Sequence, residues 1–225
     1  MHLGLIGGIG PAATEFYYRL LARAHAAAGR RMELTIVNAD ARELIANMTA
    51  GAPDRQAEIF AGLTRRLAAA GAEAVAITSM SGHFCAAEFV PRSALPVLGA
   101  LSALADELAR RGLRRVGLLG TRLVMQSRVY GALSAFDVVL PPGDRLDATH
   151  DAYVAMATVG EVREEQREVF FDVGRALCRT HGAEVVILGG TDLFLAFEGR
   201  DCGFPTLDSA RVHVEALARA CGIGA

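Results

Sequence analysis

The sequence contains no lysine, and all 23 of its basic residues are arginines. This absence excludes chemistry that depends on a side-chain amine. A pyridoxal-phosphate enzyme and a Schiff-base aldolase both need a lysine nucleophile, and a Walker-type phosphate loop needs a lysine beside the phosphates. The chain therefore belongs to none of these three classes.

Cysteine is also scarce, and no two cysteines form a CxxC pair. Zinc clusters and redox dithiols both need closely spaced cysteines. We therefore predict no metal site and expect free thiols at all four positions, which are Cys85, Cys178, Cys202 and Cys221.

Charge and hydropathy exclude two kinds of partner. The formal net charge is only −2, and no cluster of basic residues is large enough to follow a phosphate backbone, so we expect no nucleic acid partner. The N-terminal run MHLGLIGGIGP is too short and too rich in glycine for a signal peptide or a membrane span. We expect a cytoplasmic protein that does not bind a membrane.

Short β-rich runs alternate with longer segments of helical period along the whole chain. Alternation of this kind favours an α/β fold in which helices flank mostly parallel sheets. The predicted strands are HLGLI, ELTIVN, AVAIT, LRRVGLLG, FDVVLP and EVVILGG. The predicted helices cover residues 11–29, the segment after Asp54, and residues 124–135, 163–181 and 209–221.

An internal repeat predicts two similar lobes. The triplet Gly-Ala-Glu at residues 71–73 recurs 111 residues later at residues 182–184, and both copies precede an apolar strand. The segments GLIG and GLLG lie 113 residues apart, and LPVL and FPTL lie 109 residues apart. Three similar offsets in the same order indicate a pair of pseudo-symmetric α/β lobes. We predict that residues 1–98 and 208–225 form the first lobe and that residues 99–207 form the second.

Ligands of parallel α/β sheets bind at the carboxyl ends of the strands, so the segments after AVAIT and VVILG are candidates for a shared crevice. Residues 78–83 (TSMSGH) place three hydroxyls and an imidazole after the first of these strands. Hydroxyls can surround a carboxylate with donors, and His83 could act as a general acid or base. A helix cap at Ser81 and a structural role for His83 are the alternatives.

Glycine-rich segments complete the candidate site. The run GGIGP lies between a strand and a helix, where glycines let backbone N–H groups approach a carboxylate or another small anion, although a tight turn is the alternative. The run GGTD follows the strand VVILG, at the place in the second lobe that matches residues 78–83, and its Asp192 supplies a carboxylate or caps the next helix. The predicted substrate-binding residues are Gly8, Ile9, Ser81, Thr121, Gly190 and Thr191.

Together these segments resemble the cofactor-independent aspartate/glutamate racemase superfamily, from GGIGPAAT at residues 7–14 to GGTD at residues 189–192. The resemblance implies two lobes, an amino acid substrate between them, no cofactor and a homodimer. In that family one cysteine from each lobe transfers a proton on opposite faces of the α-carbon. Both thiols are missing here, because Ser79 and Gly190 stand at the matching positions.

The resemblance and the missing thiols leave three functions open. The first is an isomerase or lyase that acts on a small carboxylic or amino acid, with Ser79, His83 and Asp192 as candidate catalytic residues. The second is a relative that binds a small carboxylate without catalysis, which Gly190 favours. The third is a hydrolase with Ser79 as nucleophile and His83 as base, although the loop lacks a GxSxG elbow.

Overall fold

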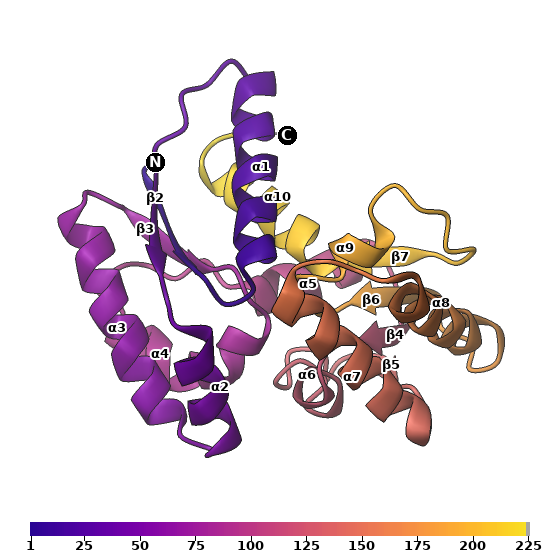
Figure 1. Cartoon of the computed structure of the whole chain (residues 1–225). Helices are drawn as coiled ribbons and strands as arrows, with labels where there is room; N and C mark the ends of the chain where they lie inside the picture. Colours follow the sequence, from indigo (N-terminus) through magenta and orange to yellow (C-terminus); the bar gives the residue numbers. More distant parts are fainter. Residues whose placement is uncertain (224–225) are drawn as a thin grey trace. The chain divides into compact units, whose positions relative to one another are not determined.

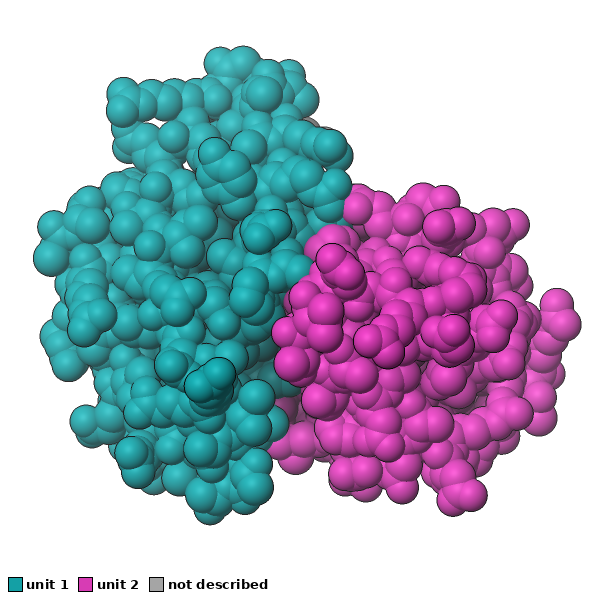
Figure 2. Space-filling model, in the orientation of Figure 1, with its two compact units in different colours: residues 1–100, 213–225 teal, residues 101–212 magenta. Residues whose placement is uncertain are grey.

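The computed structural model describes residues 1–223 and divides the chain into two compact units. Unit 1 comprises Met1–Ala100 and the C-terminal segment from His213, and unit 2 comprises Leu101–Val212 (Figure 2). Each unit contains one parallel sheet flanked by helices (Figure 1). The predicted α/β class and its two-lobe organisation are therefore confirmed.

Unit 1 is built on a three-stranded parallel sheet with the strand order β2-β1-β3. Its strands are β1 (Leu3–Gly7), β2 (Leu34–Asn38) and β3 (Ala74–Ile77). Its helices are α1 (Pro11–Ala27), α2 (Ala41–Thr49), α3 (Pro53–Ala69) and α4 (Ala86–Phe89), with short 3₁₀ helices η1 (Ser81–Cys85) and η2 (Val90–Arg92).

Unit 2 is built on a four-stranded parallel sheet with the strand order β5-β4-β6-β7. Its strands are β4 (Arg115–Leu119), β5 (Asp137–Val139), β6 (Val185–Leu188) and β7 (Thr206–Asp208). Its helices are α5 (Ala100–Arg110), α6 (Arg122–Gln126), α7 (Asp144–Val159), α8 (Glu164–Arg179) and α9 (Phe194–Phe197). The last helix, α10 (Ser209–Ala220), begins in unit 2 and ends in unit 1.

The internal repeat is visible in the strand pairing. In unit 1, Val75 of β3 forms an isolated parallel bridge with Val97, next to the strand order β2-β1-β3. In unit 2, the matching residue Val186 of β6 pairs with Thr206 of β7, next to β5-β4-β6. The two sheets therefore have the same order of neighbours, as the three sequence offsets predict.

Paired glycines let the helices pack closely against both sheets. Gly4 of β1 lies under Leu67 of α3, and a Cβ at this position would come within 2.9 Å of Leu67 Cδ1. Gly117 of β4 has the same relation to Leu177 of α8, with a Cβ-to-Cδ1 distance of 3.1 Å. Both leucines are fully buried. The repeated glycine is thus a packing residue, because a side chain there would push the helix away from the sheet.

The structure corrects the helix that the pattern predicts over residues 124–135. Helix α6 ends at Gln126, and Arg128, Val129 and Tyr130 all adopt a left-handed backbone conformation with φ between 48° and 53°. Three consecutive left-handed residues cannot continue a right-handed helix. The pattern also misses helices α2, α5 and α7 and the short helices α4 and α9. The apolar side chains of α7 are distributed around the helix rather than along one face, so its periodicity is weak.

Candidate functional site

A glycine turn joins β1 to α1 in unit 1. Gly8 has φ +85°, and a Cβ there would lie 2.1 Å from Asn38 Oδ1. Its N–H donates to Thr14 Oγ1 at 3.0 Å, and Thr14 Oγ1 lies 3.1 Å from Thr78 Oγ1 beyond the end of β3. The turn is therefore anchored at the carboxyl edge of the sheet. The Ile9 side chain is buried in the core, so only its backbone could contact a ligand.

Ser79 and Ser81 have different environments in the segment after β3. The buried Ser79 Oγ accepts a hydrogen bond from the Gly82 N–H at 3.3 Å. Ser79 thus holds the first turn of η1, whereas the sequence offers Ser81 as the cap. The Ser79 hydroxyl keeps its own hydrogen for donation. The Ser81 side chain is partly exposed, so both serines offer a hydroxyl at this edge of the sheet.

The backbone holds both ring nitrogens of His83. Nδ1 lies 2.7 Å from the carbonyl oxygen of Ser79, and Nε2 accepts a hydrogen bond from the Ala100 N–H at 3.4 Å. A neutral ring with its proton on Nδ1 satisfies both contacts. Burial lowers the pKa of His83 to about 4, although the Ser79 hydrogen bond opposes this shift. In this structure the His83 ring therefore contacts the backbone of Ser79 rather than its hydroxyl, which does not support the hydrolase hypothesis.

In unit 2, Asp192 is paired with a residue that the sequence pattern does not single out. The hydroxyl of Tyr153 on α7 donates to Asp192 Oδ2 at 3.0 Å, and both side chains are buried. Burial and the charge of Asp192 raise the pKa of Tyr153 well above its ordinary value. Thr191 is also buried beside this pair. The pair lies at the loop that follows β6, which is the carboxyl edge of the second sheet.

Thr121 begins helix α6 in the loop after β4. Its Oγ1 accepts from the Val124 N–H at 3.3 Å, so this predicted ligand residue is also a helix cap. The N–H of Arg122 donates to His150 Nδ1 at 3.2 Å. Burial, followed by the charge of Arg122, lowers the pKa of His150. His150 and Tyr153 are one turn apart on α7, so this helix places one titratable side chain beside the loop after β4 and another beside the loop after β6.

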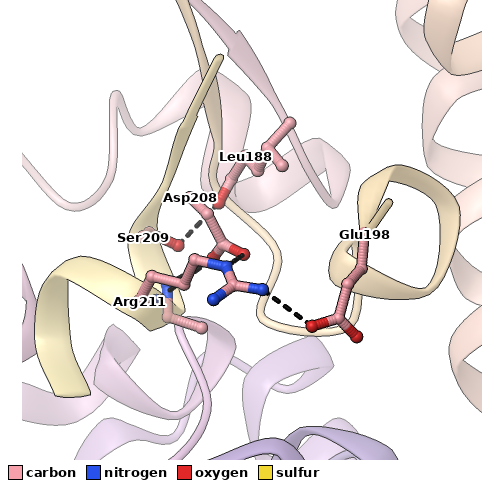
Figure 3. Close-up of polar contacts among 6 residues, drawn as sticks. Leu188, Glu198, Asp208, Ser209 and Arg211 are labelled. Atoms are coloured by element: carbon pink, nitrogen blue, oxygen red, sulfur yellow. Dashed lines mark hydrogen bonds and ion pairs between the residues drawn. The ribbon is translucent and has the colours of Figure 1, made fainter. Parts of the chain in front are cut away.

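A third polar cluster lies between β7 and α10 (Figure 3). The Asp208 carboxylate accepts from two backbone N–H groups at the start of α10, and burial raises its pKa to about 6. Arg211 lies 3.7 Å from Asp208 Oδ2 and donates to Glu198 Oε1 at 2.7 Å. Ser209 Oγ donates to the carbonyl oxygen of Leu188 at 2.6 Å, which ties the helix to β6.

Two of these features have different signals in the sequence. Asp208 follows the repeated segment FPTL and directly precedes the helix predicted over residues 209–221, so its place before that helix is visible in the sequence. Tyr153 and His150 could not be found in this way because α7 itself is not predicted.

Within residues 1–223, no cluster of three or more His, Cys, Asp or Glu side chains is arranged to hold a metal. No helix in the same range combines the length and apolar character needed to cross a membrane.

A family model described as Asp/Glu/Hydantoin racemase matches residues 6–217. The chain belongs to this racemase family. A crystal structure from Yersinia pestis, provisionally described as an Asp/Glu racemase, is 26% identical with a TM-score of 0.85, and the match covers 98% of this chain and 99% of that chain. An aspartate racemase homologue from Pyrococcus horikoshii OT3 is 25% identical with a TM-score of 0.80 over the same shares.

A third solved structure has a similar fold at a lower sequence identity. The aspartate racemase of Picrophilus torridus is 19% identical to this racemase family member, with a TM-score of 0.75 over 100% of this chain and 96% of that chain. The fold is thus shared over almost the full length of both chains. The candidate residues of this family member lie in loops at the carboxyl edges of its two sheets.

Proposed function

We propose that this racemase family member is an isomerase or lyase that moves a proton at the α-carbon of a small carboxylic or amino acid, with its own side chains and without a bound cofactor. The observation that carries the proposal is the family match over residues 6–217, together with the buried Asp192–Tyr153 pair at the carboxyl edge of the second sheet. Proton transfer at carbon needs a positioned acid or base, and buried titratable groups at such an edge are typical of one.

Hydroxyl and backbone donors support a carboxylate ligand. The hydroxyls of Ser79 and Thr121 accept hydrogen bonds from backbone N–H groups, so their own hydrogens remain for a substrate oxygen. Ser81 and Thr191 add two further hydroxyls, and the Ile9 N–H lies at the start of α1, where the helix dipole favours an anion. We assign these groups to substrate binding, beside the glycine backbone at Gly8 and Gly190, and Asp192 to the proton-transfer machinery of unit 2.

The contacts of His83 bear on the two alternative functions, a serine hydrolase and a relative that binds a carboxylate without catalysis. With both ring nitrogens held by the backbone and a pKa lowered to about 4, His83 is better suited to shape the segment after β3 than to move protons. This weakens the serine hydrolase hypothesis. It keeps a second candidate open, which is a relative that binds a small carboxylate in the same site without turnover.

The decisive experiment is proton NMR in heavy water with the purified protein and a panel of amino, hydroxy and dicarboxylic acids. Loss of an α-proton signal or a new product signal is the expected result. Asp192→Asn should reduce the rate at least 100-fold, because a neutral amide can neither exchange a proton nor hold the Tyr153 hydroxyl as a charged acceptor does. Asp172→Asn is the matched control, since Asp172 is an exposed carboxylate on α8 of the same unit.

The possible outcomes separate the two functions. Line broadening of one acid without exchange or product would support the binding relative. Turnover that Asp192→Asn leaves intact would remove Asp192 from the reaction, while the enzyme assignment would stand. Neither binding nor chemistry with any acid of the panel would contradict the small-carboxylate ligand itself.

A further inference from the structure

Tyr153 occupies the space that a side chain at residue 190 would fill. A Cβ built on Gly190 would lie 2.1 Å from Cε2, 2.6 Å from Cζ and 2.8 Å from Oη of Tyr153. Distances below 3.0 Å are essentially never seen for a real Cβ atom. Residue 190 must therefore be glycine while Tyr153 keeps this position. The space beside Gly190, in the loop after β6, is instead filled by the phenol of Tyr153 on α7.

The phenol is held in one orientation. Its hydroxyl donates to Asp192 Oδ2 at 3.0 Å, and both residues are almost completely buried. A buried hydroxyl with a charged acceptor is strongly fixed, because breaking this contact would remove a hydrogen-bond donor from a buried carboxylate. The loop that contains Gly190 and Asp192 follows a strand of a parallel sheet, which is where α/β folds bind their ligands. The phenolic oxygen thus lies at the binding edge.

We propose that Tyr153 is a catalytic proton donor of the reaction inferred above, in the place of the side chain that residue 190 lacks. This inference rests on the proposed function. In the step, the hydroxyl hydrogen turns from Asp192 to the carbanionic α-carbon of the substrate. The phenolic O–H bond breaks, a C–H bond forms, and the resulting phenolate takes back a proton from water. Asp192 orients the hydroxyl between turnovers.

The electrostatics support a donor rather than an acceptor of protons. Burial and the negative charge of Asp192 raise the pKa of Tyr153 well above its ordinary value, so the phenol stays protonated at neutral pH. Even so, a phenol is far more acidic than the C–H bond next to a carboxylate, so transfer to a carbanion is favourable. A phenolate base would be rare under these conditions. The unit 2 side of the reaction should therefore protonate more readily than it deprotonates.

The test compares Tyr153→Phe with Tyr18→Phe, on whichever acid the NMR panel identifies as substrate. Phenylalanine keeps the ring that fills the space beside Gly190 and removes only the hydroxyl. We expect kcat to fall at least 100-fold with KM nearly unchanged, and the unfolding temperature to fall by only a few degrees, because Asp192 loses one buried hydrogen-bond donor. Tyr18→Phe should have no effect, because Tyr18 is half exposed on α1.

A second measurement uses fluorinated tyrosine in place of the natural residue, which preserves the shape and lowers the phenol pKa. If the protonated phenol is required, kcat should decline at a lower pH than in the wild type. This pH profile also tests the role of Tyr153 if the Tyr153→Phe variant fails to fold. A Tyr153→Phe enzyme that keeps its rate within threefold, or an unchanged pH profile with fluorinated tyrosine, would overturn the role of Tyr153 alone. No turnover by the wild type would overturn both the role and the proposed function.

Discussion

His83 and His213 meet edge to face inside unit 1, with ring centroids 6.4 Å apart and ring planes at 74°. His213 Nε2 donates to the carbonyl oxygen of Leu98 at 2.9 Å, and its Nδ1 accepts from the Tyr17 hydroxyl at 2.9 Å. His83 Nε2 accepts a hydrogen bond from the N–H of Ala100, which is two residues after Leu98. The two rings thus fix the segment that leaves unit 1, and both are neutral.

This pair predicts a protein that loses stability in mild acid. Burial lowers the pKa of His83 to about 4, and burial together with His83 lowers that of His213 to about 3, from an ordinary value of 6.5. The unfolded chain therefore binds these protons more readily than the folded chain. The stability is complete above pH 6.5 and declines as the pH falls towards 4, by up to about 1.4 kcal/mol per pH unit for each histidine.

Urea denaturation between pH 8 and pH 4.5 checks this expectation. His213→Gln should lower the free energy of unfolding at pH 8, because it disturbs the contacts to Tyr17 and Leu98. It should also flatten the pH dependence, because glutamine does not titrate. His181→Gln, at the end of α8 in unit 2, is the control. A pH slope that is the same in wild type and His213→Gln would contradict the prediction.

Gly8→Ala is predicted to destabilise unit 1 by about 1–3 kcal/mol. The new Cβ would meet Asn38 Oδ1 at 2.1 Å and the carbonyl oxygen of Ala39 at 2.6 Å, and the backbone there has φ +85°. Gly29→Ala is a matched control for backbone strain alone. Gly29 has φ +61°, but nothing lies within 4 Å of the place that its Cβ would take.

Thermal unfolding of the two variants measures the difference. Gly29→Ala should cost about 1 kcal/mol from its left-handed backbone, and Gly8→Ala should cost clearly more. Equal losses would mean that the contacts around Gly8 relax at no cost. In that case the tight turn after β1 would not need glycine for its packing.

Thiol-directed reagents are predicted to leave the native protein active. Cys85 is fully buried, and burial raises its pKa to about 12, so its thiolate is essentially absent at neutral pH. Burial also raises the pKa of the partly exposed Cys178. We expect turnover to survive treatment with iodoacetamide, whereas all four cysteines should react in urea. Inactivation in step with the modification of one cysteine would place a thiol in the reaction.

The repeated architecture could be predicted from local patterns, whereas the key contacts of the site could not. Gly4 and Gly117 recur because each strand needs the same close approach of a helix, and such a requirement leaves a visible repeat. The partners of the functional side chains are distant in sequence instead. Tyr153 reaches Asp192 across 39 residues, and His83 reaches Ala100 across 17. No periodicity reports such contacts, so the sequence gives no sign that Tyr153 fills the space beside Gly190.

Asp208→Asn is predicted to stabilise the protein at neutral pH, although it removes an ion pair. Burial raises the folded pKa of Asp208 from 3.8 to about 6, even though Arg211 and two backbone N–H groups favour the charged form. The folded state therefore holds the proton more tightly than the unfolded state, and stability declines as the pH rises from about 4 to 6. Asparagine keeps the acceptor for α10 without the buried charge, so we expect a gain of about 1–3 kcal/mol at pH 7.

Asp208→Ala separates the effect of the charge on stability from the effect of the hydrogen bonds that Asp208 accepts at the start of α10. Alanine also removes the charge but leaves the first N–H groups of α10 without their acceptor, so it should be about 1 kcal/mol less stable than Asp208→Asn. Urea denaturation at pH 7 and pH 4.5 measures both effects, and the advantage of asparagine over the wild type should disappear at the lower pH. If Asp208→Asn is instead less stable than the wild type at pH 7, the attraction between Asp208 and Arg211 exceeds the cost of burying the carboxylate. The arginine would then be the residue that keeps Asp208 charged at the end of β7.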